Sequence, residues 1–408
     1  MGNKLYVLGA GPGGKEYVTP DVMAAIRACS AVACAERYFD IVRSHPNVIE
    51  MKDFRETFEK IKEELKSGSA AFLLSGDTGI FSLLPLIKKN FPKEEIVVLP
   101  GISSLQILCA RACEVWQDAV ILSGHGRKIC GTKVLDAAEH NRLVIFFCDA
   151  EKNPAWLCRL LDGAGLGSIE AFVGEKLASD DERISRGTAS ELAQNYFDGL
   201  SIVLLINEKH TERLPLLPED ADFIRSPDVP MTHEEVRAVI TAKLRLTPNS
   251  VLWDLGAGSG SVSAAAAPFC REVHAVEINS SAAALILKNI DKLRLHNVKV
   301  YMGSALDAID GLPSPSVVFI GGSGRELPAL LKNIASLGQG IRVVVSAVSL
   351  KTIALCSQEL SGDNFKNFDA VQIAASRIKT VGKTQIWQAQ NPVVIFSAET
   401  CHERGDNK

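Results

Sequence analysis

Short apolar runs alternate with helical patterns along the first half of the chain. The predicted strands are Lys4–Leu8, Ala31–Cys34, Ala70–Leu74, Ile96–Leu99, Ala119–Leu122, Leu143–Cys148, Ile169–Val173 and Ile202–Ile206. Thr19-Pro20 predicts a helix start, with threonine as the N-cap and proline at the first helical position. Strands that alternate with helices in this way indicate an α/β fold.

The pattern lapses between Asn207 and Pro230, where polar and proline-bearing sequence predicts a domain boundary. A helix is expected over Thr232–Leu244. Further strands are predicted at Val251–Leu255, Glu272–Glu277, Val298–Met302, Val317–Ile320, Arg342–Val348, Ala370–Ala374 and Val393–Ser397. The 408 residues suit two or three domains. We expect domains at 1–207 and 226–400, joined by a linker at 208–225.

The segment 251–260, VLWDLGAGSG, carries the strongest functional pattern. A strand ends at Asp254 and runs into Gly256-Ala257-Gly258-Ser259-Gly260, and Glu277 closes the next strand. Such glycines let a ligand approach the backbone, and the acid can accept hydrogen bonds from a ribose. A dinucleotide site needs G-x-G-x-x-G, whereas Ser261 stands at the third glycine position. The pattern therefore favours S-adenosylmethionine (SAM), whose amine suits Asp254, over a turn that serves packing alone.

Residues 9–14 do match G-x-G-x-x-G after a strand, and Glu36 lies about 20 residues further on. NAD or FAD must therefore be weighed. In a dinucleotide site the helix opens directly from the glycines, but here the helix signal comes only at Thr19-Pro20. Pro12 also removes a backbone donor from the loop. Both features disfavour a dinucleotide.

Three further strands of the first half end in loops of small residues: 75–79 (SGDTG), 100–104 (PGISS) and 123–127 (SGHGR). Loops at strand carboxyl ends line the ligand crevice of an open α/β sheet. We expect them to form a cleft in which backbone groups contact an extended ligand. The alternative is that all three are ordinary tight turns.

Composition narrows the classes of partner. The net charge is −4, so no global basic field attracts nucleic acid. No apolar run approaches the ~20 residues of a membrane span. The ten cysteines are scattered, mostly in apolar surroundings, and include Cys109 and Cys113 within one expected core helix. Buried free thiols in a reducing cytoplasm are expected, with no metal site.

The chain resembles two methyltransferase families of cobalamin biosynthesis, joined as in the two-domain decarboxylating precorrin methyltransferases. Across about residues 3–207, YVLGAGPGGKEYVTP, LLSGDTGIFS, LPGISSLQ and SGHGR are similar to the tetrapyrrole methylase family. The later segments DVPMTHEEVRAVITAKLRLTPNSVLWDLGAGSGSVS, AVEIN, GSALDAIDGLPSPSVVFIGGSG and QAQNPVVI resemble the C-15 decarboxylating methyltransferases. The resemblance implies a tetrapyrrole methylase fold of two α/β subdomains, followed by a Rossmann-like class I SAM methyltransferase domain.

The resemblance also implies one SAM site in each domain. In the first domain the implied contacts are Pro12, Asp77, Ser103 and Ser104. In the second they are Thr232, Gly256, Ala257, Gly258, Ser259, Gly260, Glu277 near the ribose and Ala305 near the adenine. The implied reaction is methylation of C-5 and C-15 of a precorrin-6Y-type tetrapyrrole or its cobalt counterpart, with loss of an acetate carboxylate. Self-association of both domains is implied as well.

Two positions depart from the family patterns. Thr78 replaces the proline of Gly-Asp-Pro, and His233 replaces the lysine after Pro-Met-Thr. A histidine there neutralises a substrate carboxylate only when it is protonated.

Because the implied substrate carries many carboxylates, basic residues beside the glycine loops are candidate anchors. The candidates are Arg127, Lys128, His233 and Arg325, with a further basic cluster at Arg377, Lys379 and Lys383. Each is otherwise a solvated surface charge. His125 is a candidate acid or base, or a histidine that stabilises its loop.

Two alternative functions stay open on the sequence. One is a SAM-dependent methyltransferase in which only the C-terminal site acts, on RNA or another small molecule. The other is a protein that binds SAM or a tetrapyrrole without catalysis.

Overall fold

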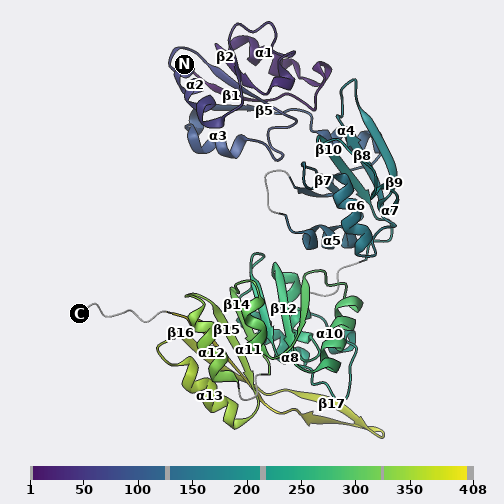
Figure 1. Ribbon diagram of the computed structural model, residues 1–408, viewed down its shortest axis with the longest axis vertical. Coiled ribbons are helices and arrows are strands. Elements are labelled where there is room, and N and C mark those ends of the chain that lie inside the picture. The colour runs from purple at the N-terminus through teal and green to yellow at the C-terminus, as the bar shows by residue number, and fades with distance from the viewer. Residues whose placement is uncertain (1–2, 125–128, 212–216, 323–325, 402–408) are drawn as a thin grey trace, which may run out of the picture. The chain divides into compact units, whose positions relative to one another are not determined.

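The computed structural model describes residues 3–124, 129–211, 217–322 and 326–401. It divides into two compact units, Met1–Glu212 and Arg213–Lys408. Each unit is built on mixed α/β layers (Figure 1).

The first unit begins with a five-stranded parallel sheet in the order β3-β2-β4-β1-β5. Its strands are β1 Leu5–Gly9, β2 Ala31–Cys34, β3 Val48–Glu50, β4 Ala70–Leu74 and β5 Ile96–Leu99, and its helices are α1 Pro20–Ala28, α2 Phe54–Ser67 and α3 Leu84–Asn90. The next helix, α4 Ser104–Ala112, packs on the second sheet of this unit. Successive side chains of β1 enter opposite cores, since Leu5 and Val7 pack on one face and Leu8 on the other. A sheet covered on both faces explains the continuous apolar runs of its central strands.

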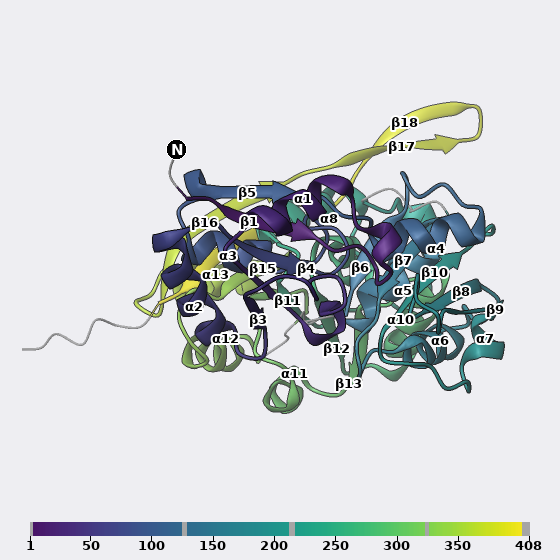
Figure 2. The ribbon, with the colours of Figure 1, turned by 90° about the horizontal axis from the view of Figure 1, so that it is seen from above.

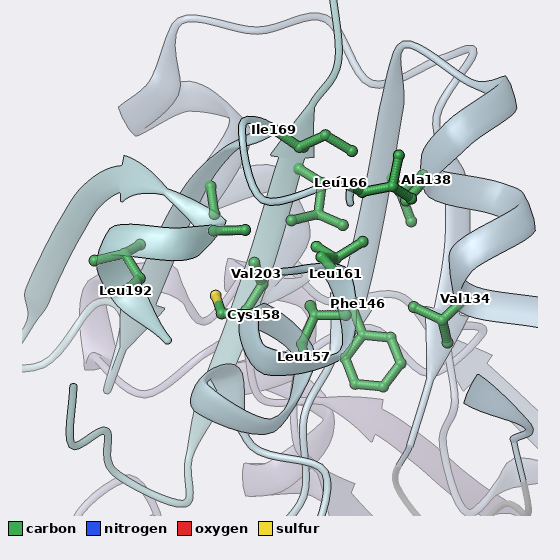
Figure 3. Packing of buried hydrophobic residues seen from close by; sticks show 14 of the residues in the cluster. Val134, Ala138, Phe146, Leu157, Cys158, Leu161, Leu166, Ile169, Leu192 and Val203 are labelled. Carbon is green, nitrogen blue, oxygen red and sulfur yellow. The ribbon is translucent and has the colours of Figure 1, made fainter. Parts of the chain in front are cut away.

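A second, mixed sheet completes this unit, in the order β6-β7-β10-β8-β9. Its strands are β6 Val120–Ser123, β7 Leu143–Phe147, β8 Glu170–Glu175, β9 Arg183–Thr188 and β10 Ser201–Ile206, and its helices are α5 Gly131–His140, α6 Pro154–Gly163 and α7 Ala189–Leu192. Figure 3 shows Phe146 and Val203 of this sheet packed with Leu157 and Leu161 of α6.

The second unit contains a seven-stranded sheet in the order β13-β12-β11-β14-β15-β19-β16. The strands are β11 Val251–Leu255, β12 Glu272–Glu277, β13 Val298–Met302, β14 Val317–Ile320, β15 Arg342–Ala347, β16 Phe365–Ile373 and β19 Val393–Thr400. The helices are α8 Glu234–Leu244, α9 Ser261–Ala266, α10 Ser280–Lys292, α11 Ala305–Ala308, α12 Leu327–Ser336 and α13 Leu350–Leu360. The five strands β11–β15 run parallel, and β19 is antiparallel to β15 and β16. Strand order reverses between β11 and β14, the point at which such sheets bind ligands.

The sequence analysis missed four strands: the three-residue β3 in the first sheet, and three largely exposed strands. Two of the exposed strands, β17 Ser376–Val381 and β18 Thr384–Ala389, form a hairpin that projects from the body of the second unit (Figures 1 and 2). The third exposed strand is β9, which is hydrogen-bonded to β8 along its backbone. Two ion pairs, Arg183–Glu175 and Arg186–Glu170, also connect these strands. Exposed strands of this kind turn no apolar face toward a core, so their sequences lack the alternation that predicts a half-buried strand.

The expectation of buried thiols is wrong for some cysteines. Cys113 and Cys130 are exposed, and Cys401 is half-buried. Cys109 is buried in α4, but Cys113 ends that helix in the left-handed conformation with φ 57° and faces solvent. Across the described residues, no helix is long and apolar enough to cross a membrane.

Candidate functional site

In the first unit, the glycine loops that follow β1, β4 and β5 meet through their backbones. A Cβ at Gly9 would lie 2.4 Å from the backbone nitrogen of Gly101 and 2.8 Å from the carbonyl oxygen of Gly76. Gly76 N–H donates to the Gly11 carbonyl at 2.8 Å. Only glycine permits so close an approach, so these residues fix the loops against one another.

A cavity of about 230 Å³ lies beside these loops, between the two sheets of this unit. Pro12, Asp77, Ser103 and Ser104, the four contacts implied by the resemblance, all line it. The structure therefore brings these sequence-predicted residues to one place. The far wall comes from the second sheet and includes Ser123, Phe147, Cys148 and Ser201.

Asp77 and Ser103 are already engaged in holding the loops. The carboxylate of Asp77 accepts from Gly79 N–H at 2.7 Å and from Gly101 N–H at 3.2 Å. Ser103 caps α4, and its own N–H donates to Gln106 Oε1 at 2.8 Å. Thr78, in place of the family's proline, is buried, and its carbonyl accepts from Ser82 Oγ. Their first role is to shape the cleft, because the Asp77–Gly101 bond joins two loops and the other bonds fix the conformation within a loop.

Two lining residues were missed by the sequence analysis. Arg37 is the only basic residue among the described lining residues, and its guanidinium lies 4.9 Å from the Tyr38 ring. Phe81 adopts a left-handed φ of 48°, and its ring meets Phe147 edge-on at 5.2 Å. A non-glycine residue with positive φ is uncommon and is typical of functional loops. The candidates His125, Arg127 and Lys128 lie outside the described residues.

The helix geometry weighs against a dinucleotide at residues 9–14. A short 3₁₀ turn, Lys15–Tyr17, follows the glycines, and α1 begins only at Pro20. Thr19 caps that helix by accepting from Val22 N–H, as the sequence predicts. No helix N-terminus therefore opens from the glycines to receive a pyrophosphate.

In the second unit, the turn after β11 lies against the loop after β14. Gly256 has φ +74°, and a Cβ there would lie 2.1 Å from the Gly322 carbonyl oxygen. Gly258 and Gly260 are also left-handed, at φ +56° and +76°. The predicted glycine spacing is thus required by backbone conformation and by contact with the neighbouring loop.

Glu277 lies at the end of β12, against this turn. Its carboxylate accepts from Gly258 N–H at 2.8 Å and from Asn279 N–H at 2.9 Å, and it is only 8% exposed. Its backbone carbonyl accepts from Gly303 N–H, two residues before Ala305 at the start of α11. The glycine turn, the acid and Ala305 therefore follow three adjacent strands at the same sheet edge.

Asp254 is a fully buried carboxylate beside the glycine turn. Ser263 Oγ donates to Oδ2, whereas Oδ1 has no partner among the described residues. Ser259 Oγ is likewise buried without one. Burial, with a smaller contribution from the charge of Glu277, raises the pKa of Asp254 to about 6. Buried polar atoms rarely lack partners, so these two mark a place where a polar ligand fits.

An entry segment, residues 217–233, precedes α8 and packs against the glycine turn. The Pro230 carbonyl would lie 3.1 Å from a Cβ at Gly258. Buried Asn289 donates to the carbonyls of Ser259 and Ile224, which ties the turn to this segment. Sequence reasoning missed Asn289, because an amide inside a helix looks like any surface residue.

Buried Arg237 holds the entry segment from within α8. Its guanidinium donates to the Pro218 carbonyl, to Asp220 Oδ1 at 3.1 Å and to the Thr232 carbonyl at 2.6 Å. The candidate cofactor residue Thr232 is therefore fixed by its backbone beside the glycine turn.

The predicted basic anchors of this unit differ in their surroundings. His233 Nδ1 lies 2.8 Å from Asp220 Oδ2. Arg377, named with Lys379 and Lys383 as a basic cluster, forms a two-bond ion pair with Glu235 and also contacts Asp220. Arg325 lies outside the described residues.

Asp220 is the shared acceptor of this network. Burial alone raises its pKa, but the hydrogen bonds from His233 and Arg237 and the charges of Arg237 and Arg377 bring the pKa below its ordinary value. It therefore stays ionised. Across the described residues, no group of three or more His, Cys, Asp or Glu side chains could hold a metal ion.

Both units are similar to known protein families. Residues 4–193 match the tetrapyrrole (corrin/porphyrin) methylases, and residues 225–400 match the precorrin methyltransferase domain. A precorrin-6Y C(5,15)-methyltransferase [decarboxylating] from Sinorhizobium sp is 27% identical over 332 residues, which are 80% of this chain and 78% of that protein.

A probable cobalt-precorrin-6B C(15)-methyltransferase (decarboxylating) from Sulfurisphaera tokodaii is 33% identical over 46% of this chain and 98% of its own length. A solved precorrin-6Y C5,15-methyltransferase structure from Geobacter metallireducens is 31% identical and covers 45% of this chain and 97% of that one, with a TM-score of 0.43. The chain belongs to the precorrin methyltransferase family.

Proposed function

We propose that this chain is a bifunctional SAM-dependent C-methyltransferase of cobalamin biosynthesis. It methylates C-5 and C-15 of a precorrin-6Y-type tetrapyrrole, or its cobalt counterpart, and removes the carboxylate of an acetate side chain. One observation carries the proposal: each unit has its own glycine-loop site, and each unit matches a different methylase family. The relative from Sinorhizobium sp spans both units.

Methyltransferases of this family generally use SAM, and we assign one SAM site to each unit. SAM supplies a methyl group already activated by the positive sulfonium, so the protein chiefly aligns donor and acceptor in a dry cleft. In the first unit, Pro12, Asp77, Ser103 and Ser104 line the cavity that would hold it. Loops that are fixed by backbone contacts suit this task, because movement of a loop that lines the cleft would disturb the alignment of the methyl donor and acceptor.

In the second unit the donor set fits the same cofactor. Asp254 Oδ1 and Ser259 Oγ are buried polar atoms without a partner among the described residues, and an ammonium group would satisfy the carboxylate. Glu277 keeps free lone pairs beside its two backbone bonds, and these can accept from a ribose diol. The turn Gly256–Gly260 lies beside these groups and would contact the ligand through its backbone, and Ala305 offers a small apolar side chain.

We assign C-5 methylation to residues 1–207 and C-15 methylation with decarboxylation to residues 226–400. The first assignment rests on the tetrapyrrole methylase match, and the second on the precorrin methyltransferase domain match. Arg37 is the candidate anchor for a substrate carboxylate in the first cleft. The substrate is a small molecule, and we propose no role in nucleic-acid binding.

We also propose self-association, which the family resemblance implies. On one face of the projecting hairpin, Ile378 and Trp387 pair across the two strands, and they are 59% and 72% exposed. Exposed apolar pairs of this kind favour a protein interface. Light scattering of the wild type and of Trp387→Ser tests it, and a wild type that stays monomeric at micromolar concentration refutes it.

The function is tested by incubating the full chain with precorrin-6Y and SAM and measuring the molecular mass of the product by mass spectrometry. Two added methyl groups and one lost carbon dioxide are expected. Titration calorimetry should show two cofactor sites, of which Glu277→Ala removes one. The matched control is Asp363→Ala, which removes an exposed carboxylate from the turn before β16. An unchanged substrate mass, or two intact sites in Glu277→Ala, would contradict the proposal.

A further inference from the structure

Asp220 is a buried carboxylate contacted by the imidazole of His233 and by the guanidiniums of Arg237 and Arg377. It lies on the 3₁₀ turn Asp220–Asp222 and is 3% exposed. Oδ1 accepts from Arg237 at 3.1 Å, while Oδ2 lies 2.8 Å from His233 Nδ1 and 3.0 Å from Arg377 Nη1. So many contacts fix the carboxylate, and the carboxylate in turn fixes the orientation of the imidazole.

His233 is the last residue of the entry segment, between the part that packs on the glycine turn Gly256–Gly260 and the start of α8. Pro230, three residues earlier, packs on Gly258, and the Thr232 carbonyl is held by Arg237. His233 itself is the N-cap of α8, and its side chain is 42% exposed. The backbone on its N-terminal side is therefore anchored at the glycine turn, while its ring is free to meet a ligand.

The two ring nitrogens of His233 have different roles. An ionised Asp220 can only accept, so Nδ1 carries a hydrogen and donates it. Within the described part of the chain, Nε2 has no bonded protein group. In the neutral ring Nε2 can only accept, and it repels a carboxylate lone pair. In the protonated ring it donates and carries charge, as the lysine of the family pattern would.

Other charged groups around this ring belong to three segments: the entry segment, α8 and β17. Arg225 lies 3.8 Å from Asp220 Oδ2. Glu234 and Glu235 occupy the first turn of α8, and Arg377 of β17 pairs with both of them. Arg237 faces Asp220 from the next turn. Three carboxylates, of Asp220, Glu234 and Glu235, are thus matched by three guanidiniums, of Arg225, Arg237 and Arg377.

We propose that Asp220 is a positioning residue that presents His233 Nε2 to a carboxylate of the tetrapyrrole at the C-terminal site, which makes substrate binding there depend on the protonation of His233. The inference rests on the proposed function and names the residue pair that recognises one substrate carboxylate. It also gives this chain a dependence on pH that a lysine at the same position would not have.

The test measures C-15 methylation by the full chain between pH 5.5 and 8.5, with C-5 methylation as the internal control. In the wild type, KM for the C-15 step should rise about tenfold or more toward high pH as the charged hydrogen bond is lost, while kcat changes little. His233→Lys should keep KM low and flat across this range. His233→Gln should keep KM high and flat.

Arg377→Gln separates positioning from a merely structural role. It removes a cation that faces Asp220, so the rise in KM should move to higher pH. Arg377→Gln also leaves the ion pair between Arg237 and Asp220 in place. Asp220→Asn would instead leave the buried guanidinium of Arg237 without its carboxylate, which is expected to destabilise the fold. Asp220→Asn, where folded, should raise KM for the C-15 step at pH 6.

The outcomes distinguish this inference from the proposed function. Absence of cofactor binding by the wild type would refute both. Normal cofactor binding and C-15 methylation, with a wild-type KM that does not vary with pH or varies equally in His233→Lys, would overturn this inference alone.

Discussion

The substitution Asp254→Asn tests the electrostatics of the C-terminal cofactor site. Burial raises the pKa of Asp254 from its ordinary value of 3.8 to about 6 in the folded protein. The difference is about two pH units, and at 1.36 kcal/mol per unit it corresponds to about 3 kcal/mol. Because the carboxyl is fully buried, solvent does not screen this cost.

The direction in which the free energy of unfolding changes with pH depends on whether the folded or the unfolded state binds the proton of Asp254 more tightly. The folded protein holds a proton on Asp254 up to about pH 6, whereas the unfolded chain releases it near pH 3.8. The proton on Asp254 therefore stabilises the folded state fully below pH 3.8, and this stabilisation is lost as the pH rises through 6. The amide introduced by Asp254→Asn cannot ionise, so any cost of burying it is independent of pH. The free energy of unfolding of the wild type, relative to Asp254→Asn, should fall by about 3 kcal/mol between pH 4 and pH 8.

The assay is urea unfolding followed by tryptophan fluorescence. Two of the four tryptophans, Trp116 and Trp156, lie in the first unit, so a background with both changed to phenylalanine reports the second unit through Trp253 and Trp387. SAM should offset the cost in the wild type at pH 8 and bind more weakly to Asp254→Asn. If the two proteins keep a constant difference in unfolding free energy from pH 4 to pH 8, the reasoning is wrong.

Three further predictions concern the glycine turn, the first cleft and the thiols. Gly256→Ala should abolish the C-terminal cofactor site in calorimetry, because its Cβ would lie 2.1 Å from the Gly322 carbonyl oxygen, and an intact site would contradict the close approach. Arg37→Met should raise KM for C-5 methylation about tenfold while C-15 methylation in the same chain is unchanged, and equal losses at both carbons would refute its role as a local anchor. A thiol reagent at pH 8 should label exposed Cys113 and Cys130 first in peptide mass spectrometry, because burial both shields the other thiols and raises the pKa of several of them.

The sequence alone determined most of the strands and both glycine-loop sites. Parallel strands buried on both faces show as short apolar runs, and a left-handed turn with a close backbone approach requires glycine in any tertiary context. The turn at Gly256 is an example, because the strand, the glycines and Glu277 are all local in sequence. The same reasoning failed for β9 and for the hairpin β17–β18, which are exposed and turn no apolar face toward a core, and for β3, which has only three residues.

Only the tertiary structure decided which charged residues work together. In the sequence Arg377 is one of a cluster of basic residues, but in the fold Asp220 and Glu235, at least 142 residues away along the chain, form ion pairs with it. Asp220, Arg237 and Asn289 carried no motif, since their roles come from burial and from partners distant in sequence. Local patterns fix backbone conformation, whereas ion pairs and unpartnered buried atoms exist only once the chain has folded and water has been excluded.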